Sequence, residues 1–441
     1  MAVATAAAVL GDSKLRRDAA ERAAVKADQQ GARLLAARAR TLECRALANL
    51  GENERAAVVC EAAHRGFVEA GDRGGIARAL HATAEVPLNQ GDFLRAGELY
   101  RQALAIMREI GDRQGTATEL VNLGLVQVKQ GNFAAAHQLY AESLANYTAA
   151  GDQNGIAAVT GNQGNLYRAE GRLPEALSNY QRVLALSNQL GHRSSAALAM
   201  AAIGDVLMDE GDLSGADKMY QQSLGIEREI GEKSYAAERM ASIGELLAQQ
   251  GQTDRAVQIL QEALQQQEQL GKRGSAAETR LVLGEVDCDL GRFQEAEQLA
   301  RSALAVFQEQ REPNQEISAR ALLCRSLLLQ GKKDEATEVL SGALELAKNS
   351  SKVITRRLLA LDYARLLAAT NHPARAEQTA RQVMSEAGKS MVWLRLEAQL
   401  VLGQIDLQRK PAAGRAELDQ VVKAAREKGF ERIARQASAS L

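Results

Sequence analysis

GDFLRAGELYRQALAIMREIGDRQGTATELVNLGLVQVKQG, residues 91–131, is the stretch of sequence that decides the fold. It has a glycine at each end and one in the middle, and this spacing of twenty residues recurs along most of the chain. The recurring glycines are Gly71, Gly91, Gly111, Gly131, Gly151, Gly171, Gly191, Gly211, Gly231, Gly251, Gly271, Gly291 and Gly331. Glycine adopts at little cost the left-handed conformation that ends many helices. The spacing therefore predicts that a helix ends and another begins at each of these glycines.

The segments between the glycines are amphipathic, with apolar residues three or four positions apart. Matching apolar positions in two successive units are Ala96, Leu99, Tyr100, Ala103, Leu104 and Met107, then Ala136, Leu139, Tyr140, Ser143, Leu144 and Tyr147. Several glycines are followed by an aspartate suited to capping the next helix, namely Asp72, Asp92, Asp112, Asp152 and Asp212. One helix pair cannot bury such a face alone, so the pairs must stack. The sequence predicts an all-α solenoid.

The overall charge argues against two classes of partner. Lys and Arg total 54 and Asp and Glu total 55, which gives a net charge of -1. No bulk attraction to nucleic acid or to an anionic membrane follows from this balance. The apolar residues 1–10 lack a basic segment before them and are too short to span a bilayer. We expect a soluble, cytoplasmic protein that binds neither nucleic acid nor membrane.

The cysteines and histidines indicate no chemistry. The four cysteines, Cys44, Cys60, Cys288 and Cys324, have no CxxC spacing and fit small core residues in a reducing compartment, so no disulfide is expected. The five histidines show no metal-ligand spacing and no close pairing with a carboxylate. Phosphate-binding and nucleophile motifs are also missing from the sequence. We expect neither an enzyme nor a cofactor or metal site.

The unit resembles the tetratricopeptide repeat, in its longer form of about 40 residues found in kinesin light chains and bacterial signalling proteins. The residues that carry the resemblance are Leu123-Gly124, Ala136, Tyr140 and Ser143-Leu144, and again Ile203-Gly204, Ala216, Tyr220 and Ser223-Leu224. The resemblance implies a right-handed superhelical solenoid of about ten antiparallel helix pairs. It also implies a concave inner wall, made by the first helix of each pair, that binds extended peptides or partner helices.

The repeat pattern predicts four parts of the chain. We expect a partial repeat at 1–30, seven regular 40-residue repeats at 31–310, three degenerate repeats at 311–429 and a capping helix at 430–441. In the degenerate part Arg311, Asn371 and Pro411 replace regular glycines. Residues 1–10 read as the tail of an interrupted helix followed by a turn at Gly11-Asp12. This suggests either an array cut from a longer protein or a naturally frayed end.

The inner-wall positions of the repeat, carried over from the resemblance, provide the candidate partner-binding residues. They are Asn122, Lys129, Asn162, Asn165, Arg168, Asp205, Asp209, Glu238, Glu245, Glu278, Glu285, Asp289 and Arg325. Asn122 and Asn162 occupy the position where relatives with the longer repeat use asparagine to hold a peptide backbone, since an amide both donates and accepts hydrogen bonds. We hypothesise a wall that is amide-rich across 118–168, acidic across 205–289 and basic beyond 325, where Arg365 follows Arg325.

The acidic segment contains like charges one helical turn apart, which is unfavourable in an isolated helix. Within the same helices the only basic relief is Arg292, close to Asp289. These carboxylates either pair with neighbouring helices, bind a basic partner segment, or simply face water. Only the second of these interpretations makes the carboxylates part of a binding site.

The leading function is a scaffold that binds a peptide or partner helix, as part of a larger bacterial signalling or regulatory protein. The alternative is an autoregulatory domain that occludes an upstream kinase or DNA-binding domain. RNA binding is disfavoured because the inner positions are acidic rather than basic and aromatic. The sequence leaves the partner's identity and the oligomeric state open.

Overall fold

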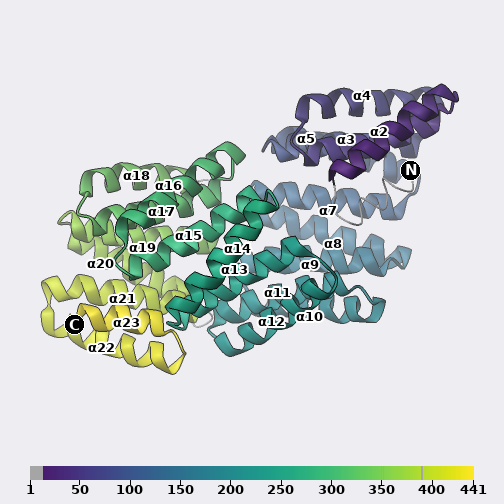
Figure 1. The fold of residues 1–441 in the computed structure, drawn as a ribbon. Helices are drawn as coiled ribbons and strands as arrows, with labels where there is room; N and C mark the ends of the chain where they lie inside the picture. The colour runs from purple at the N-terminus through teal and green to yellow at the C-terminus, as the bar shows by residue number, and fades with distance from the viewer. Residues whose placement is uncertain (1–12, 349, 351, 389–390) are drawn as a thin grey trace. The chain divides into compact units, whose positions relative to one another are not determined.

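The protein is a stack of antiparallel helix pairs. The computed structural model describes residues 13–348, 350, 352–388 and 391–441, and within them every regular element is an α-helix (Figure 1). The expectations for residues 1–10 and for the Gly11-Asp12 turn lie outside the described residues. Consecutive helices pack side by side from α2 to α8 and from α10 to α23. The all-α solenoid predicted from the sequence is confirmed.

The chain divides into two compact units, Met1–Gln163 and Gly164–Leu441. The first contains α2 (Ser13–Gln29), α3 (Arg33–Asn49), α4 (Asn53–Ala70), α5 (Arg73–Asn89), α6 (Phe93–Glu109), α7 (Arg113–Lys129) and α8 (Phe133–Ala150). Helix α9 (Gln153–Ala169) contains the boundary. The second contains α10 (Leu173–Leu190), α11 (Arg193–Glu210), α12 (Leu213–Glu229), α13 (Lys233–Gln249), α14 (Thr253–Gln269), α15 (Arg273–Asp289), α16 (Phe293–Gln310), α17 (Pro313–Leu329), α18 (Lys333–Ala347), α19 (Val353–Ala369), α20 (Pro373–Ala387), α21 (Val392–Arg409), α22 (Pro411–Glu427) and α23 (Glu431–Ser440).

The glycine turns form as predicted. Every regular glycine from Gly31 to Gly291, and Gly331, has a positive φ of 65° to 88°. Arg311 and Asn371 adopt the same conformation, with φ of 55° and 66°, although they carry a Cβ. Pro411 instead begins α22, where its missing N–H costs nothing. The turn geometry is therefore maintained even where the glycine is lost.

The aspartates after the glycines cap helices as expected. Asp112 accepts a hydrogen bond from the backbone N–H of Gly115 at 2.8 Å, which satisfies an otherwise unpaired donor in the first turn of α7. Four other aspartates make the same bond at 2.8 to 3.0 Å, namely Asp72, Asp92, Asp152 and Asp212. Local sequence thus specifies the start of the five helices that follow these aspartates.

In three successive repeats, a tyrosine packs against the glycine in the middle of the first helix. Tyr140 is 1% exposed, and a Cβ on Gly124 would lie 2.3 Å from its ring. Tyr180 and Tyr220 press in the same way on Gly164 and Gly204. Such close contacts between the two helices of a pair leave room for glycine alone.

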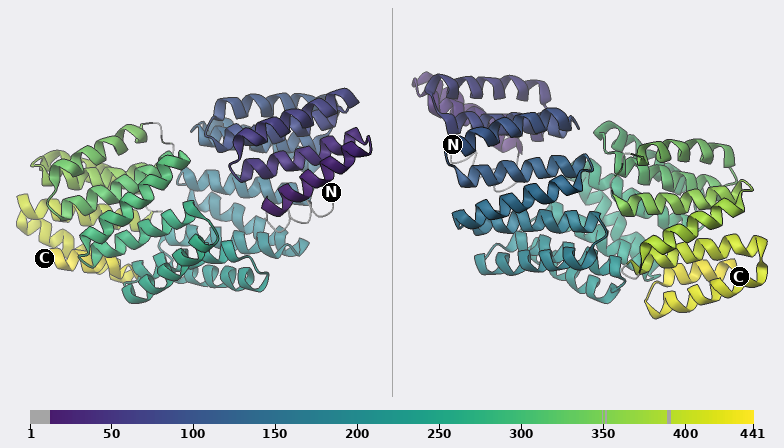
Figure 2. Two further views of the ribbon diagram at one scale, coloured as in Figure 1. Left: turned by 45° about the horizontal axis from the view of Figure 1, so that its top comes forward. Right: turned by 180° about the vertical axis from the view of Figure 1, so that it is seen from behind.

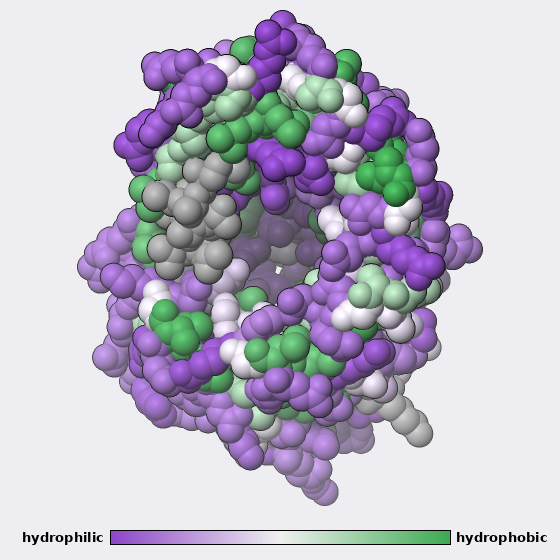
Figure 3. Space-filling model, turned by 90° about the vertical axis from the view of Figure 1, so that its right-hand side faces the viewer, coloured by the Kyte–Doolittle hydropathy of each residue, from purple (hydrophilic) through white to green (hydrophobic). Residues whose placement is uncertain are grey.

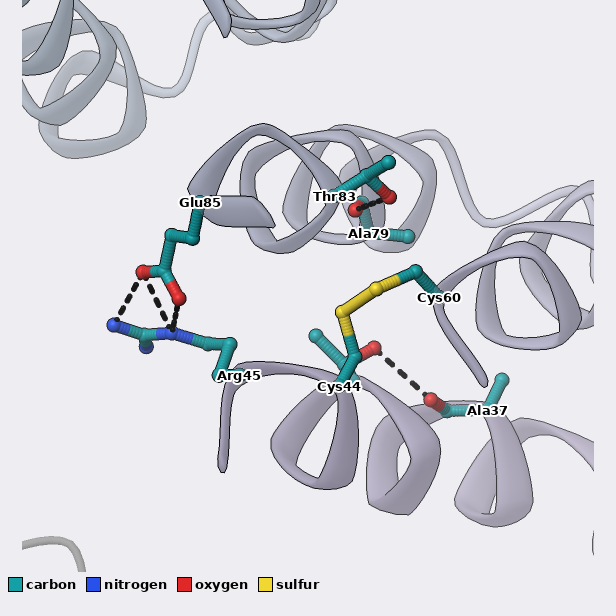
Figure 4. Close-up of a disulfide and its surroundings, with 8 residues drawn as sticks. Ala37, Cys44, Arg45, Cys60, Ala79, Thr83 and Glu85 are labelled. Atoms are coloured by element: carbon teal, nitrogen blue, oxygen red, sulfur yellow. Dashed lines mark hydrogen bonds and ion pairs between the residues drawn. A yellow bond between two sulfur atoms is a disulfide. The ribbon is translucent and has the colours of Figure 1, made fainter. Parts of the chain in front are cut away.

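The expectation of no disulfide is wrong. Cys44 on α3 and Cys60 on α4 form a disulfide with a Cα–Cα distance of 5.2 Å (Figure 4). The two helices run antiparallel from the turn at Gly51, so residues placed seven before it and nine after it come face to face. Cys288 and Cys324 are buried free thiols. The cysteine pattern therefore no longer argues for a reducing compartment.

The surface is mainly hydrophilic. Apolar side chains appear on the face shown in Figure 3 as separate small patches among polar ones. The most exposed large apolar residues are Leu94 and Val58, at 73% and 70%. No helix in the described residues combines the length and apolar content needed to cross a membrane.

Candidate functional site

Three of the predicted site residues, Asn122, Lys129 and Asn162, lie in the first unit. The Nδ2 of Asn122 donates to the carbonyl of Thr118 on its own helix at 3.0 Å, which leaves its oxygen available. Asn162 is half-buried on α9, and Lys129 is exposed at the end of α7. Their role in gripping a partner stays a prediction.

The first unit contains a buried charged cluster that the sequence reasoning missed. His81 Nδ1 lies 2.9 Å from Glu119 and its Nε2 lies 3.5 Å from Glu85, which also accepts from Arg45 at 2.9 Å (Figure 4 shows the last pair). Burial lowers the pKa of His81, but the hydrogen bonds to Glu119 and Glu85 outweigh it and raise the pKa to about 9. The expectation of no close histidine–carboxylate pairing is therefore wrong. His81 and Glu85 are one helical turn apart, so the signal was present in the sequence.

In the second unit, Arg168 forms ion pairs with both Asp205 and Asp209, and all three are predicted site residues. Arg168 donates from Nε to Asp209 and from Nη1 to Asp205, both at 2.9 Å. Asp205 also accepts from the Tyr220 hydroxyl at 2.8 Å. Burial raises the pKa of the Asp209 carboxyl despite the nearby guanidinium. Asn165, on the same helix as Arg168, accepts from the Tyr180 hydroxyl at 2.6 Å.

The second acidic pair, Glu285 and Asp289, forms ion pairs with an arginine that lies far away in the sequence. Arg432 on α23 donates from Nε to Asp289 at 2.5 Å and from Nη1 to Glu285 at 3.1 Å. Gln436 donates to the other oxygen of Asp289 at 2.6 Å. Arg292 does not relieve Asp289 as expected, since it pairs with Asp287 at 2.7 Å.

The predicted basic segment is not basic in the structure. Arg325 forms a two-pronged pair with Asp362 at 3.1 and 3.2 Å. Arg365 donates to Asp362 at 2.9 Å and to Glu397 at 3.2 Å. Asp362 and Glu397 neutralise both guanidinium groups, so the hypothesis of a free basic wall beyond 325 is wrong. Neither acid was among the inner positions considered from the sequence.

Glu245 differs from these carboxylates because, among the described residues, it has no hydrogen bond or ion pair. It lines a cavity of about 280 Å³ together with Gln249, Glu278 and Glu285. Burial, then the negative charges of Glu285, Asp205 and Asp209, raises the pKa of Glu245 to about 7. Its carboxylate therefore lacks the ion pair with an arginine that Asp205, Asp209, Glu285 and Asp289 have.

The cavity is built from the first helices of successive pairs. Its wall comes from α13, α15, α17, the start of α19, and α23. Leu281 and Val282 give it an apolar side, and Glu278 lies at the same wall. The remaining predicted acid, Glu238, accepts from the Ser275 hydroxyl at 3.2 Å. The described residues include no group of three or more His, Cys, Asp or Glu placed to hold a metal ion.

Two smaller cavities adjoin the same arginine. One of about 140 Å³ includes Glu245, Arg325 and Trp393 in its lining, and one of about 230 Å³ lies beside Asp289. Arg432 lines all three cavities. The candidate site is thus a set of three spaces in the second unit that are lined by both acidic and basic side chains, with Arg432 common to all three and Lys352 at the wall of the largest.

Two family models match consecutive parts of the chain. The model described as the MalT-like TPR region matches residues 75–239, and a tetratricopeptide repeat model matches residues 236–309. The chain is a tetratricopeptide repeat protein. The resemblance seen in the sequence is thereby confirmed, and neither matching family is an enzyme family. No curated protein matches this tetratricopeptide repeat chain by sequence.

Solved structures share the tetratricopeptide repeat fold at low sequence identity. The Rap conjugation gene regulator of the plasmid pLS20, solved in complex with the Phr* peptide, aligns with a TM-score of 0.57 at 12% identity, over 78% of this chain and 97% of that one. The apo form of RapI aligns with a TM-score of 0.51 at 12% identity, over 62% of this chain and 98% of that one. At these identities the likeness shows the fold alone.

Proposed function

We propose that this tetratricopeptide repeat chain is a non-catalytic interaction module that binds a protein segment or peptide along the inner side of its second unit. A basic side chain of the partner enters the cavity beside Glu245. The observation that carries the proposal is the unmatched Glu245 carboxylate at the wall of a 280 Å³ cavity, next to carboxylates that Arg168 and Arg432 already match.

The chemistry of the cavity favours a cation with an apolar stem. A lysine or arginine side chain can lay its methylene groups against Leu281 and Val282 and bring its charge to Glu245 and Glu285. A carboxylate next to a bound cation is more easily ionised, so partner binding lowers the pKa of Glu245 from about 7 and releases a proton.

The solved relatives support a peptide as the class of partner. The conjugation gene regulator with the same fold was solved with a peptide bound. We further propose that the amides of Asn122 and Asn162 hold a partner backbone on the first unit. We propose that the module works in the cytoplasm as the docking part of a bacterial signalling protein.

A peptide-display screen against the full chain tests the proposal. We expect selected peptides to be enriched in Lys and Arg, and Glu245→Gln to weaken their binding about tenfold by titration calorimetry. Glu262, an exposed glutamate on α14 of the same repeat, provides the matched control, and Glu262→Gln should leave affinity unchanged. Selection of peptides without positive charge, together with full affinity in Glu245→Gln, would refute the proposal.

A further inference from the structure

Helix α23 lies against its sequence neighbours α21 and α22 and also against α13, a helix far from it in the sequence. Figures 1 and 2 show it beside α21 and α22. A Cβ on Gly251, in the turn after α13, would lie 2.9 Å from the Cβ of Glu431. The glycine at this turn therefore also makes space for α23.

The apolar anchor of α23 lies at its start. Phe430, the residue before the helix, and Ile433 are both 1% exposed and belong to one core cluster with Leu418 and Val421 of α22. The other buried apolar residues of α23 are Ala434 and Ala437, and alanine offers little area to bury. Beyond Ile433, the larger contacts of the helix are therefore polar.

Those contacts have the form of a ligand bound to an acidic site. The Arg432 guanidinium donates hydrogen bonds to Glu285 and Asp289, and the Gln436 side-chain amide donates one to Asp289. The two donors are four residues apart, so they lie on one face of the helix. Without Arg432, the like charges of Glu285 and Asp289 would face each other with no cation. Burial lowers the pKa of Arg432, but Asp289 and Glu285 outweigh this and raise it, so the guanidinium stays charged.

We infer that α23 is an internal ligand of the partner-binding site and that a partner displaces it by replacing Arg432. The inference rests on the proposed function and names the regulation of the same site. Because Arg432 lines all three cavities, its departure joins them into one continuous space. With the helix docked in part of the molecules, the apparent partner affinity is the intrinsic affinity multiplied by the fraction of molecules whose site is free.

The contacts of α23 also define the partner that competes best. That partner carries an arginine and a side-chain amide one helical turn apart, arranged as Arg432 and Gln436 are. The arginine replaces two charged hydrogen bonds and the amide replaces the third. A partner that has basic residues without this spacing pairs with Glu245 but does not displace α23.

Peptide exchange in the full chain tests the inference. The probe is a fluorescent synthetic peptide with the sequence of residues 430–441, FERIARQASASL. We expect it to bind the Arg432→Ala chain at least tenfold more tightly than the wild-type chain, in which α23 holds the site. The matched control is Arg415→Ala, since Arg415 is exposed on the neighbouring helix α22 and lines none of the three cavities, and it should bind the peptide as weakly as the wild type does. Equal peptide affinity for the wild-type and Arg432→Ala chains would overturn the inference.

A second measurement uses the unaltered protein and so does not depend on the folding of a variant. Hydrogen exchange of the wild-type chain should show the amides of α23 exchanging at least tenfold faster than those of α22, because α23 opens on its own. Equal protection of the two helices would show that α23 is a fixed part of the core and would overturn the inference. If display-selected basic peptides bind in a Glu245-dependent manner in that case, the proposed function stands and only its regulation is rejected.

Discussion

The two units use buried charge in opposite ways. In the first unit, His81, Glu85, Glu119 and Arg45 form a closed cluster in which Glu119 is 2% exposed. In the second unit, carboxylates of the same helix positions surround cavities, and one of them, Glu245, has no cation of its own. The repeat supplies the same backbone in both. Side-chain charge at the inner positions therefore distinguishes the buried cluster of the first unit from the proposed binding site of the second.

Breaking the cluster of the first unit should have the largest effect. His81→Ala leaves the buried Glu119 without its partner, and we expect a loss of about 3 kcal/mol in unfolding free energy. Chemical denaturation followed by circular dichroism measures it, with His64→Ala on α4 as the control. A loss similar to that of the control would mean that the cluster is not structural. The second unit should melt unchanged in the same experiment.

The same cluster predicts a pH dependence confined to the first unit. The pKa of His81 rises from 6.5 to about 9 on folding, so its stabilisation is complete below about pH 6.5 and is lost as the pH rises through about 9. Denaturation at pH 6.5, 8 and 9.5 should show the first unit weakening in the wild type. The trend should be absent in His81→Gln; an identical trend there would assign it to other groups.

The disulfide should also distinguish the units, with an effect of similar size on the first unit. It closes a loop between residues 16 apart in the first unit, which is expected to contribute about 3 kcal/mol. The chain without reductant should show two free thiols after denaturation, Cys288 and Cys324. Reductant should lower the melting temperature of the first unit only. Four free thiols in the untreated chain would contradict the pairing.

Helix caps should show what the two units have in common. Asp112→Ala and Asp212→Ala each remove one cap bond, and we expect each to cost about 1 kcal/mol. Asn132→Ala is the matched control, because Asn132 occupies the same position before α8 without a side-chain cap bond. Unequal costs at the two aspartates would show that the repeats differ locally as well as in their inner positions.

The features that could be predicted from the sequence are those that depend on contacts within one helix pair. The turns at the regular glycines, the caps such as Asp112 and the burial of Tyr140 follow from residues within one pair, and all are confirmed. Arg432 was not predictable as the partner of Asp289, because 143 residues separate them and only the superhelix of the second unit brings them together.

Two features were within reach of the sequence and were missed. Cys44 and Cys60 lie at nearly equal distances from the turn at Gly51, which places them opposite each other in an antiparallel pair. His81 and Glu85 have the spacing of neighbours on one helix face. Both follow from applying the helix-pair geometry to individual side chains rather than to the apolar pattern alone.

The central claim is that Glu245 binds a cationic group of the partner, and the pH dependence of peptide affinity tests it most directly. A display-selected basic peptide should bind the wild-type chain about tenfold more tightly at pH 8 than at pH 6, because the Glu245 carboxyl, with its pKa of about 7, must ionise to pair with it. In Glu245→Gln the affinity should be lower and constant across that range. The same pH dependence in both proteins would contradict the account.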